Sequence, residues 1–149
     1  MQSFLFYKKA GKIIYNFIAS LTGGAPRSST RRNTDMGARM QAFDLARLIF
    51  QQKSSETLYF EFLRVPDLSM GLYVLPAGGT DPQSPHAEDE VYYVVSGVAQ
   101  VKVGEEDRAV KAVSIVYVAK NVEHRFHSIE EELRILVFFA PAEYSLQPD

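Results

Sequence analysis

The chain has 149 residues, a length that suits one domain with a hydrophobic core. Apolar residues make up 46% and charged residues 23%, and the absence of cysteine excludes both a disulfide framework and a thiolate metal site. The net charge is only −2, but residues 1–40 hold seven basic residues and one acidic residue, which leaves the rest of the chain at −8.

The first 39 residues differ in composition from the rest of the chain. Residues 1–20 mix lysines with aromatic residues and isoleucines, and residues 21–39 are rich in Gly, Ser, Thr and Arg, as is typical of a linker. Three interpretations of this basic N-terminal extension stay open: an arm that packs on the domain or a partner, a targeting segment, or a start-site artefact with Met40 as the natural beginning. Apolar residues at helical spacing beside lysines make membrane contact through residues 1–21 one form of the second interpretation.

Residues 40–52 are predicted to form a short helix, because Leu45, Leu48 and Ile49 recur at helical spacing. From residue 56 onward, stretches rich in β-branched and aromatic residues are separated by Gly, Pro and acidic turns. Strands are expected near residues 56–65, 68–75, 89–95, 98–103, 108–112, 114–118, 123–128 and 132–139. Short strands at this spacing indicate a sandwich or a barrel, and the almost wholly apolar last strand is predicted to be central.

Two histidine-bearing segments carry the polar residues that could converge on a metal ion. Side chains of a strand point to one face at every second residue. In the first segment, four polar residues share that spacing if the segment is extended: Ser84, His86, Glu88 and Glu90. In the second segment His124 faces inward, whereas His127 is three positions away and faces out. Without cysteine, any metal must be held by imidazole and oxygen ligands.

These segments resemble the two motifs of the cupins, a family of small jelly-roll barrels. The first cupin motif is G-x5-H-x-H-x3-E-x6-G, and here its positions are occupied by Gly78, Ser84, His86, Glu90 and Gly97. The second motif is G-x5-P-x-G-x2-H-x3-N, and here its positions are occupied by Val113, Ala119, Asn121, His124 and Ser128. Asn121 is a tolerable substitute for glycine, because asparagine accepts a positive φ more readily than most residues.

The resemblance covers roughly residues 56–140 and implies the fold. We expect an all-β, double-stranded β-helix or jelly-roll barrel of the cupin type, with a short N-terminal helix and the basic extension. Residues 40–149 are then a single cupin barrel domain, and residues 1–39 lie outside it.

The resemblance also implies a ligand set for one divalent metal ion: His86, Glu90 and His124. Serine at position 84 leaves the fourth ligand open between Ser84, Gln83, Glu88, water and substrate, since a neutral hydroxyl is a weak ligand. Two histidines and one carboxylate suit non-haem iron and are also accepted by zinc, so the metal stays open between Fe, Zn, Mn and Ni.

Three classes of function are compatible with this site. We favour a metal-dependent enzyme, an oxygenase, isomerase or lyase, acting on a small polar or aromatic molecule, with Glu88 or Tyr92 as the candidate acid or base. The alternative is a non-catalytic cupin that binds or senses a small ligand. A third interpretation is an interaction protein whose barrel is only a scaffold, because fold alone does not settle function.

The remaining expectations concern partners and location. The resemblance suggests a homodimer, and the acidic charge after residue 40 argues against nucleic-acid binding. The lack of cysteine and of a convincing export signal makes the cytoplasm the expected location.

Overall fold

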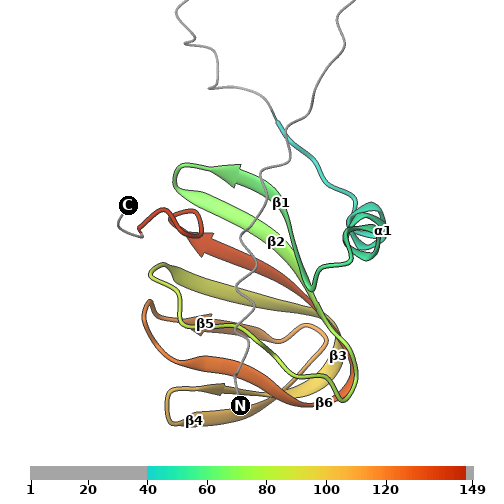
Figure 1. Ribbon diagram of the computed structural model, residues 1–149, viewed down its shortest axis with the longest axis vertical. Coiled ribbons are helices and arrows are strands. Elements are labelled where there is room, and N and C mark those ends of the chain that lie inside the picture. Colours follow the sequence, from blue (N-terminus) through green and yellow to red (C-terminus); the bar gives the residue numbers. More distant parts are fainter. Residues whose placement is uncertain (1–39, 147–149) are drawn as a thin grey trace, which may run out of the picture. The chain divides into compact units, whose positions relative to one another are not determined.

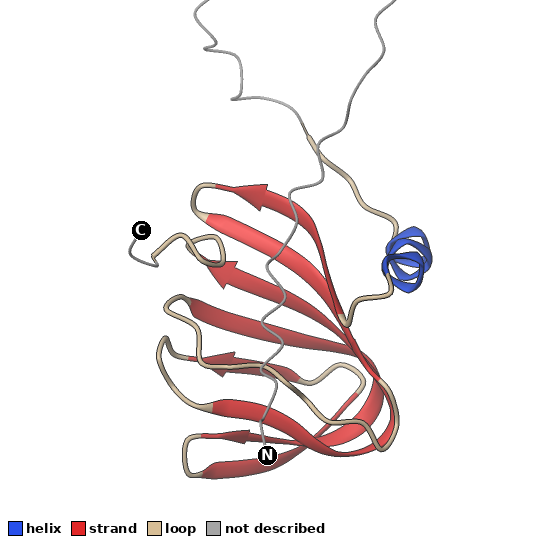
Figure 2. Cartoon of the chain, viewed as in Figure 1, coloured by secondary structure: helices blue, strands red, loops and turns tan. Residues whose placement is uncertain are grey.

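The computed structural model describes residues 40–146, which contain one helix and six strands, all paired antiparallel (Figures 1 and 2). The helix is α1 (Leu45–Ser55). The strands are β1 (Tyr59–Val65), β2 (Leu68–Leu75), β3 (Asp89–Val103), β4 (Glu106–Lys111), β5 (Ile115–Val118) and β6 (His124–Ala140). No helix in the described range is long and apolar enough to cross a membrane. The basic N-terminal extension lies outside the described residues, so its separation from the barrel domain stays a prediction.

Helix α1 begins and ends later than the predicted range of 40–52. Its start is fixed by Asp44, whose carboxylate accepts a hydrogen bond from the Arg47 N–H at 3.0 Å. Its end is fixed by Glu56, which takes a left-handed conformation with φ 57°. The apolar spacing therefore predicted the element correctly, but the capping residues decide its bounds.

The sheet has the strand order β1-β2-β6-β3-β4, and β5 pairs with β3. The first half of β3 and the second half of β6 form one layer with β1, β2 and β5. The other halves form a second layer with β4. Figure 1 shows both long strands bending over between the layers, which produces the predicted jelly-roll barrel. Strand β6 is central, as its apolar sequence predicted.

The sequence predicted two strands in place of β3 and two in place of β6, which is wrong in both cases. Each is continuous, with register shifts between Val94 and Gln100 where the pair bends. Gly97 has φ 99°, and a Cβ atom there would lie 2.7 Å from the Cα atom of Leu133. Glycine at this motif position therefore lets the bent strand lie directly against β6.

The core lies between the two layers. Along β3 and β6, buried and less buried residues alternate, so that every second side chain points inward. The inward side chains are largely aliphatic or aromatic, and the most buried include Leu75, Tyr92, Val94, Phe126, Leu133, Ile135 and Phe139. The same alternation places Glu90 and His124 inside, and buried polar side chains of this kind need polar partners.

Candidate metal centre

His86, Glu90 and His124 meet inside the barrel. One potential ligand atom from each residue lies within 4.8 Å of the other two. His86 belongs to the segment before β3, Glu90 is the second residue of β3, and His124 is the first residue of β6. The structure thus brings together the three residues that the motif resemblance implied.

The closest pair in this group is Glu90 and His124. Glu90 Oε2 lies 3.1 Å from His124 Nε2, and the two side chains are 2% and 1% exposed. Although the atoms are close, they lack hydrogen-bond geometry, and no other group in the described range bonds to either of them. A buried polar atom without a partner costs about 1–3 kcal/mol. Two imidazoles and a carboxylate surround one point, and two of these three groups carry an unpartnered atom. This arrangement fits a divalent metal ion, which would satisfy those atoms.

The two histidines differ in protonation: the surroundings of His86 favour the neutral imidazole that a metal ion needs, whereas those of His124 favour a proton that a metal ion would displace. The Nδ1–H of His124 donates to the Val122 carbonyl oxygen at 2.7 Å, which leaves the Nε2 lone pair directed toward Glu90. Burial works to lower the pKa of His124, but the Glu90 carboxylate and the Val122 carbonyl outweigh it and raise the pKa. Burial dominates at His86 and lowers its pKa, which favours the neutral imidazole that binds metals.

Two hydrogen bonds donated by backbone N–H groups hold the histidine-bearing segments together. The Asn121 N–H donates to the His86 carbonyl oxygen at 2.7 Å. The Lys120 N–H donates to the Asp89 carboxylate at 3.0 Å. The loop before β6 is thereby fixed against the loop before β3, which sets the separation of His86 and His124.

Three positions of the second motif keep a left-handed backbone although none of them is glycine. Asn121 has φ 63°, Ser128 has φ 47° and Val113 has φ 68°. The expectation that Asn121 can substitute for glycine is confirmed. Valine is a more strained substitute, because a β-branched residue rarely adopts this conformation. The path of the backbone is thus kept where the motif residues are lost.

Asp81 is a buried residue of the site that sequence reasoning missed. Its carboxylate accepts hydrogen bonds from the Tyr73 hydroxyl at 2.6 Å, from Gln83 Nε2 at 2.8 Å and from the Phe126 N–H at 2.8 Å. It therefore connects the loop before β3 to β6 beside His124. Between Thr80 and Pro82 an aspartate resembles an ordinary turn residue, so the sequence carries no signal of this role.

The candidates for a fourth ligand lie outside the group of three. Gln83 is engaged on both sides, since its Nε2 donates to Asp81 and its Oε1 accepts from the Tyr92 hydroxyl at 2.9 Å. Ser84 is exposed and lies on the wall of a cavity beside the site.

Tyr92, the candidate acid or base, is fully buried, and burial together with the Glu90 charge raises the pKa of its hydroxyl well above the usual value.

Glu88 is buried although it does not lie on a strand. It is 1% exposed. Its Oε1 accepts a hydrogen bond from the Leu146 N–H at 3.0 Å, and its Oε2 has no partner among the described residues. The segment before β3 is not a strand, so the alternation used to group Glu88 with His86 and Glu90 does not apply there.

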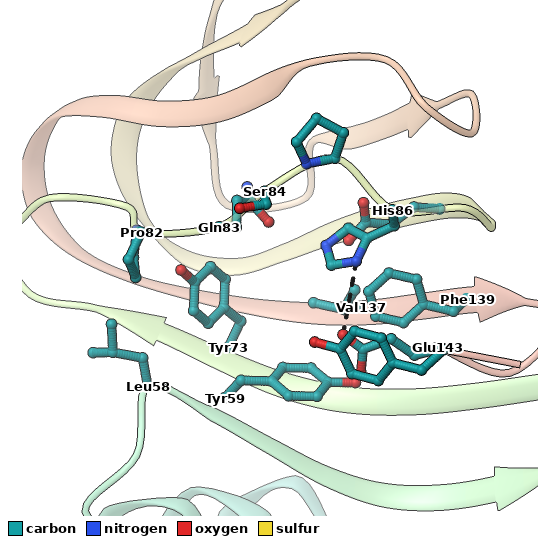
Figure 3. A pocket seen from close by; sticks show the side chains of 13 residues that line it. Leu58, Tyr59, Tyr73, Pro82, Gln83, Ser84, His86, Val137, Phe139 and Glu143 are labelled. Carbon is teal, nitrogen blue, oxygen red and sulfur yellow. Dashed lines mark ion pairs between the residues drawn. The ribbon is translucent and has the colours of Figure 1, made fainter. Parts of the chain in front are cut away.

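A cavity of about 380 Å³ opens beside His86 and Glu90 (Figure 3). Its wall contains several aromatic side chains, namely Tyr59, Tyr73, Phe139 and Tyr144. Glu143 also lines it, with Oε1 3.8 Å from His86 Nδ1, and burial raises the pKa of Glu143 to about 7. The hydroxyl of Tyr59 is buried without a partner among the described residues. This volume suits a small-molecule ligand.

His127, the third histidine, lies apart from this group, as its position in the sequence predicted. Its Nε2 lies 3.1 Å from both carboxylate oxygens of Asp107. Asp107 is on β4 and His127 on β6, the two strands that flank β3 in the second layer, and His127 is partly exposed.

The fold and the site define an all-β barrel with an interior group of two histidines and one carboxylate. The family model described as "Cupin domain" matches residues 71–139, which include both motifs. The uncharacterized protein SCO3923 of Streptomyces coelicolor is 50% identical over 104 residues, which cover 70% of this chain and 99% of that protein. The chain belongs to the cupin family.

Solved structures agree on the fold. An RmlC-like cupin family protein with a double-stranded β-helix fold from Methanocaldococcus jannaschii has a TM-score of 0.54 and 18% identity, covering 71% of this chain and 93% of that one. The DMSP lyase DddQ from Ruegeria pomeroyi has a TM-score of 0.50 and 20% identity, covering 57% of this chain and 42% of that one. Structures with related barrels therefore include a lyase.

Proposed function

We propose that this cupin is a metal-dependent enzyme, an oxygenase, isomerase or lyase, that acts on a small polar or aromatic molecule. The observation that carries the proposal is the pair of buried atoms Glu90 Oε2 and His124 Nε2, 3.1 Å apart and otherwise unpartnered among the described residues. His86 and Glu90 line the cavity, and a potential ligand atom of His124 lies within 4.8 Å of theirs. A buried cluster of this kind is unfavourable for folding unless a bound ion satisfies its polar atoms, so we interpret it as a functional site.

One divalent ion would be held by His86, Glu90 and His124. When bound, it supplies Lewis-acid polarisation of a ligand oxygen, or activation of O2 if it is iron. Three protein ligands leave coordination positions for that ligand. The hydrogen bond from His124 Nδ1 to Val122 orients the imidazole, and the cavity beside His86 and Glu90 gives the ligand room to reach the ion.

Tyr92 and Glu88 remain the proposed carriers of a proton. The Tyr92 ring lies 6.0 Å from the His124 ring between centroids, and its hydroxyl donates to Gln83, which lines the cavity. A hydroxyl with a raised pKa keeps its proton, so Tyr92 would act as a donor and not as a base. Glu88 is less well placed, because its carboxylate binds the Leu146 N–H.

Elemental analysis of the full-length protein, purified without chelator, tests the proposal. We expect near-stoichiometric Fe, Zn, Mn or Ni in the parent and a loss of that metal in both His86→Ala and His124→Ala. His127→Ala is the matched control, because it removes a histidine outside the group and should keep the metal. A parent that is metal-free and cannot be loaded would overturn the proposal.

A non-catalytic cupin that binds or senses a small ligand is the second candidate. It is favoured by one observation, namely that neither Glu88 nor Tyr92 lines the cavity. Turnover of a panel of enolic, diol and aromatic compounds by the metal-loaded protein separates the two candidates. Saturable binding without turnover of any compound would favour the binding module.

The predicted homodimer and the cytoplasmic location are part of the proposal. Ile115 and Tyr117 on β5, and Val113 just before it, are 70%, 61% and 72% exposed, which is unusual for adjacent apolar side chains. Burial of these side chains against a second copy would account for them. Light scattering on the parent and on Ile115→Asp should give a dimer and a monomer, respectively, and a monomeric parent would contradict the prediction.

A further inference from the structure

The cavity beside the metal centre is acidic. Two of its lining residues are acidic, Glu90 and Glu143, and no lysine or arginine lies among the described residues that line it. Glu90 belongs to the proposed metal centre, which leaves Glu143 as the carboxylate at the other end. A free anion would meet this carboxylate with no cationic side chain to offset it.

Glu143 is a buried carboxyl group whose ionised form has no cationic partner in the described part of the protein. Its side chain is 8% exposed, and the one positively ionisable group within 4.0 Å in the described range is His86, at 3.8 Å. His86 must be neutral to bind a metal ion. The guanidinium of Arg64 is occupied, since it donates to both carboxylate oxygens of Glu61 and to the main-chain carbonyl oxygen of Glu143.

The position of Glu143 is fixed by its own main chain. Its N–H donates to Ser69 Oγ at 2.9 Å, and its carbonyl oxygen accepts from Arg64 at 2.9 Å. These bonds hold the side chain against the cavity, and because both are made by the main chain, neither involves the carboxyl group. In Figure 3 the Tyr59 hydroxyl and the Glu143 carboxylate converge beside His86. A buried carboxyl group that is held in place and lacks a counter-ion suits recognition of a cation, which would favour its ionised form.

Aromatic rings line the cavity together with this carboxylate. The Tyr59 and Phe139 ring centroids are 6.4 Å apart, with an interplanar angle of 81°, and the His86 and Tyr144 centroids are also 6.4 Å apart. Tyr144 follows Glu143 directly and is half-exposed at the rim. Aromatic faces attract cations within about 6 Å of the ring, and desolvated ammonium groups are held in aromatic cages of this composition.

We infer that the cavity selects a small organic cation, an ammonium compound that pairs with Glu143 and the surrounding rings while an oxygen function at its other end reaches the metal centre. The inference rests on the proposed function, because the metal centre takes the oxygen end. It deepens that function by naming a substrate class. The charges at the two ends of the cavity match such a ligand. A divalent ion bound by the Glu90 carboxylate keeps a net positive charge, which attracts the oxygen function of the ligand.

Choline and its neutral carbon isostere, in which a tert-butyl group replaces the trimethylammonium group, are matched probes. Calorimetric titration of the metal-loaded, full-length protein should show choline bound about tenfold more tightly than the isostere. Glu143→Gln should remove this preference by weakening choline binding alone. Glu130→Gln removes an exposed carboxylate elsewhere and should behave as the parent does.

Tyr144→Gly is a second variant that does not touch the carboxylate. It removes a ring at a residue that has φ 61°, a conformation that glycine adopts without strain, so the fold should persist. We expect choline affinity to fall more than isostere affinity. Equal binding of the two probes by the parent, no binding of either, or a preference that survives in Glu143→Gln would each overturn the inference.

Metal content measured on the same samples separates this inference from the proposed function. A metal-loaded parent that does not prefer choline contradicts only the inference. A metal-free parent that still prefers choline, with the preference lost in Glu143→Gln, contradicts only the proposed metal enzyme. If Glu143→Gln loses its metal, the comparison of choline and isostere in Tyr144→Gly decides.

Discussion

The two histidine-bearing segments of the barrel hold the same kind of ligand by different means. Residues 78–97 keep most of the first cupin motif, including Gly97, whose missing side chain lets β3 lie against β6. Residues 113–128 keep only His124 of the second motif, yet Val113 and Asn121 have the positive φ that the motif glycines would supply. The first segment keeps its motif in residue type, and the second keeps it in backbone conformation.

The difference between the segments depends on the surroundings of each glycine position. Next to Gly97 the backbone of β6 leaves no room for a Cβ atom, so no other residue fits. Val113 is 72% exposed, so its side chain points into solvent and only the backbone strain, about 1–2 kcal/mol, opposes it. A motif glycine can thus be replaced where the replacement costs only backbone strain, but not where the new side chain would also overlap the backbone of a neighbouring strand.

The largest expected effect comes from breaking the link between the segments. Asp81→Ala should lower the free energy of unfolding by about 4 kcal/mol, because it leaves the Tyr73 hydroxyl and the Phe126 N–H buried without their acceptor. Urea denaturation measures the change. Asp67→Ala, in an exposed turn, is the control and should change stability by less than about 0.5 kcal/mol. A similar effect of both substitutions would show that Asp81 is no special link.

Gly97→Ala tests the segment that depends on residue type. The added Cβ atom meets the backbone of Glu132 and Leu133, and the residue must keep φ 99°, so we expect a loss of about 3 kcal/mol in unfolding free energy. Gly104→Ala separates the two causes, because Gly104 has φ 56° but its nearest atom would be 3.8 Å away. If both variants lose equal stability, strain and not overlap explains Gly97.

Removal of the metal should affect both segments at once, since each supplies ligands. With free metal at about a hundred times its dissociation constant, chelation should lower the unfolding free energy by about 3 kcal/mol. The same treatment should leave His124→Ala unchanged and should lower the stability of His127→Ala as it does the parent's. Thermal unfolding with and without chelator measures this, and an unchanged parent would count against the metal centre.

Val113→Gly tests the segment that depends on backbone conformation and has the smallest expected effect. Relief of the strain at φ 68° exceeds the added entropy of glycine in the unfolded chain, so we expect a gain of about 1 kcal/mol. Little burial is lost within one chain, because Val113 is 72% exposed there, and Ile115→Asp as background removes any contribution from the proposed dimer contact. A rise in melting temperature supports this account, whereas a fall would mean that the valine side chain contributes contacts that outweigh its strain.

Much of the fold could be predicted from the sequence, because its strands alternate in polarity and its breaks are marked by glycine and proline. The strand Leu68–Leu75 and the central place of β6 were predicted correctly. The continuity of β3 and β6 was not, because Ser96-Gly97 and the three glutamates at 130–132 resemble turns. Only the pairing of the two long strands with each other carries them through these stretches.

The candidate site could be predicted only in part. Motif spacing indicated His86, Glu90 and His124, because ligand spacing along the chain is local information. Glu143 and Glu88 could not be placed in the same way. Glu143 bonds to Ser69, 74 residues away, and Glu88 bonds to Leu146, 58 residues away, so their surroundings exist only in the folded chain.

The central position of β6 has a consequence for how the two ends of the cavity respond to a ligand. His124 begins a strand that is paired along its length with β2 or β3, whereas Glu143 lies beyond the last residue of β6. Amide hydrogens of β6 and β3 should therefore exchange with solvent far more slowly than those of residues 141–146. The reacting end would rest on a continuous strand, while the recognising end depends on the two main-chain hydrogen bonds that hold Glu143.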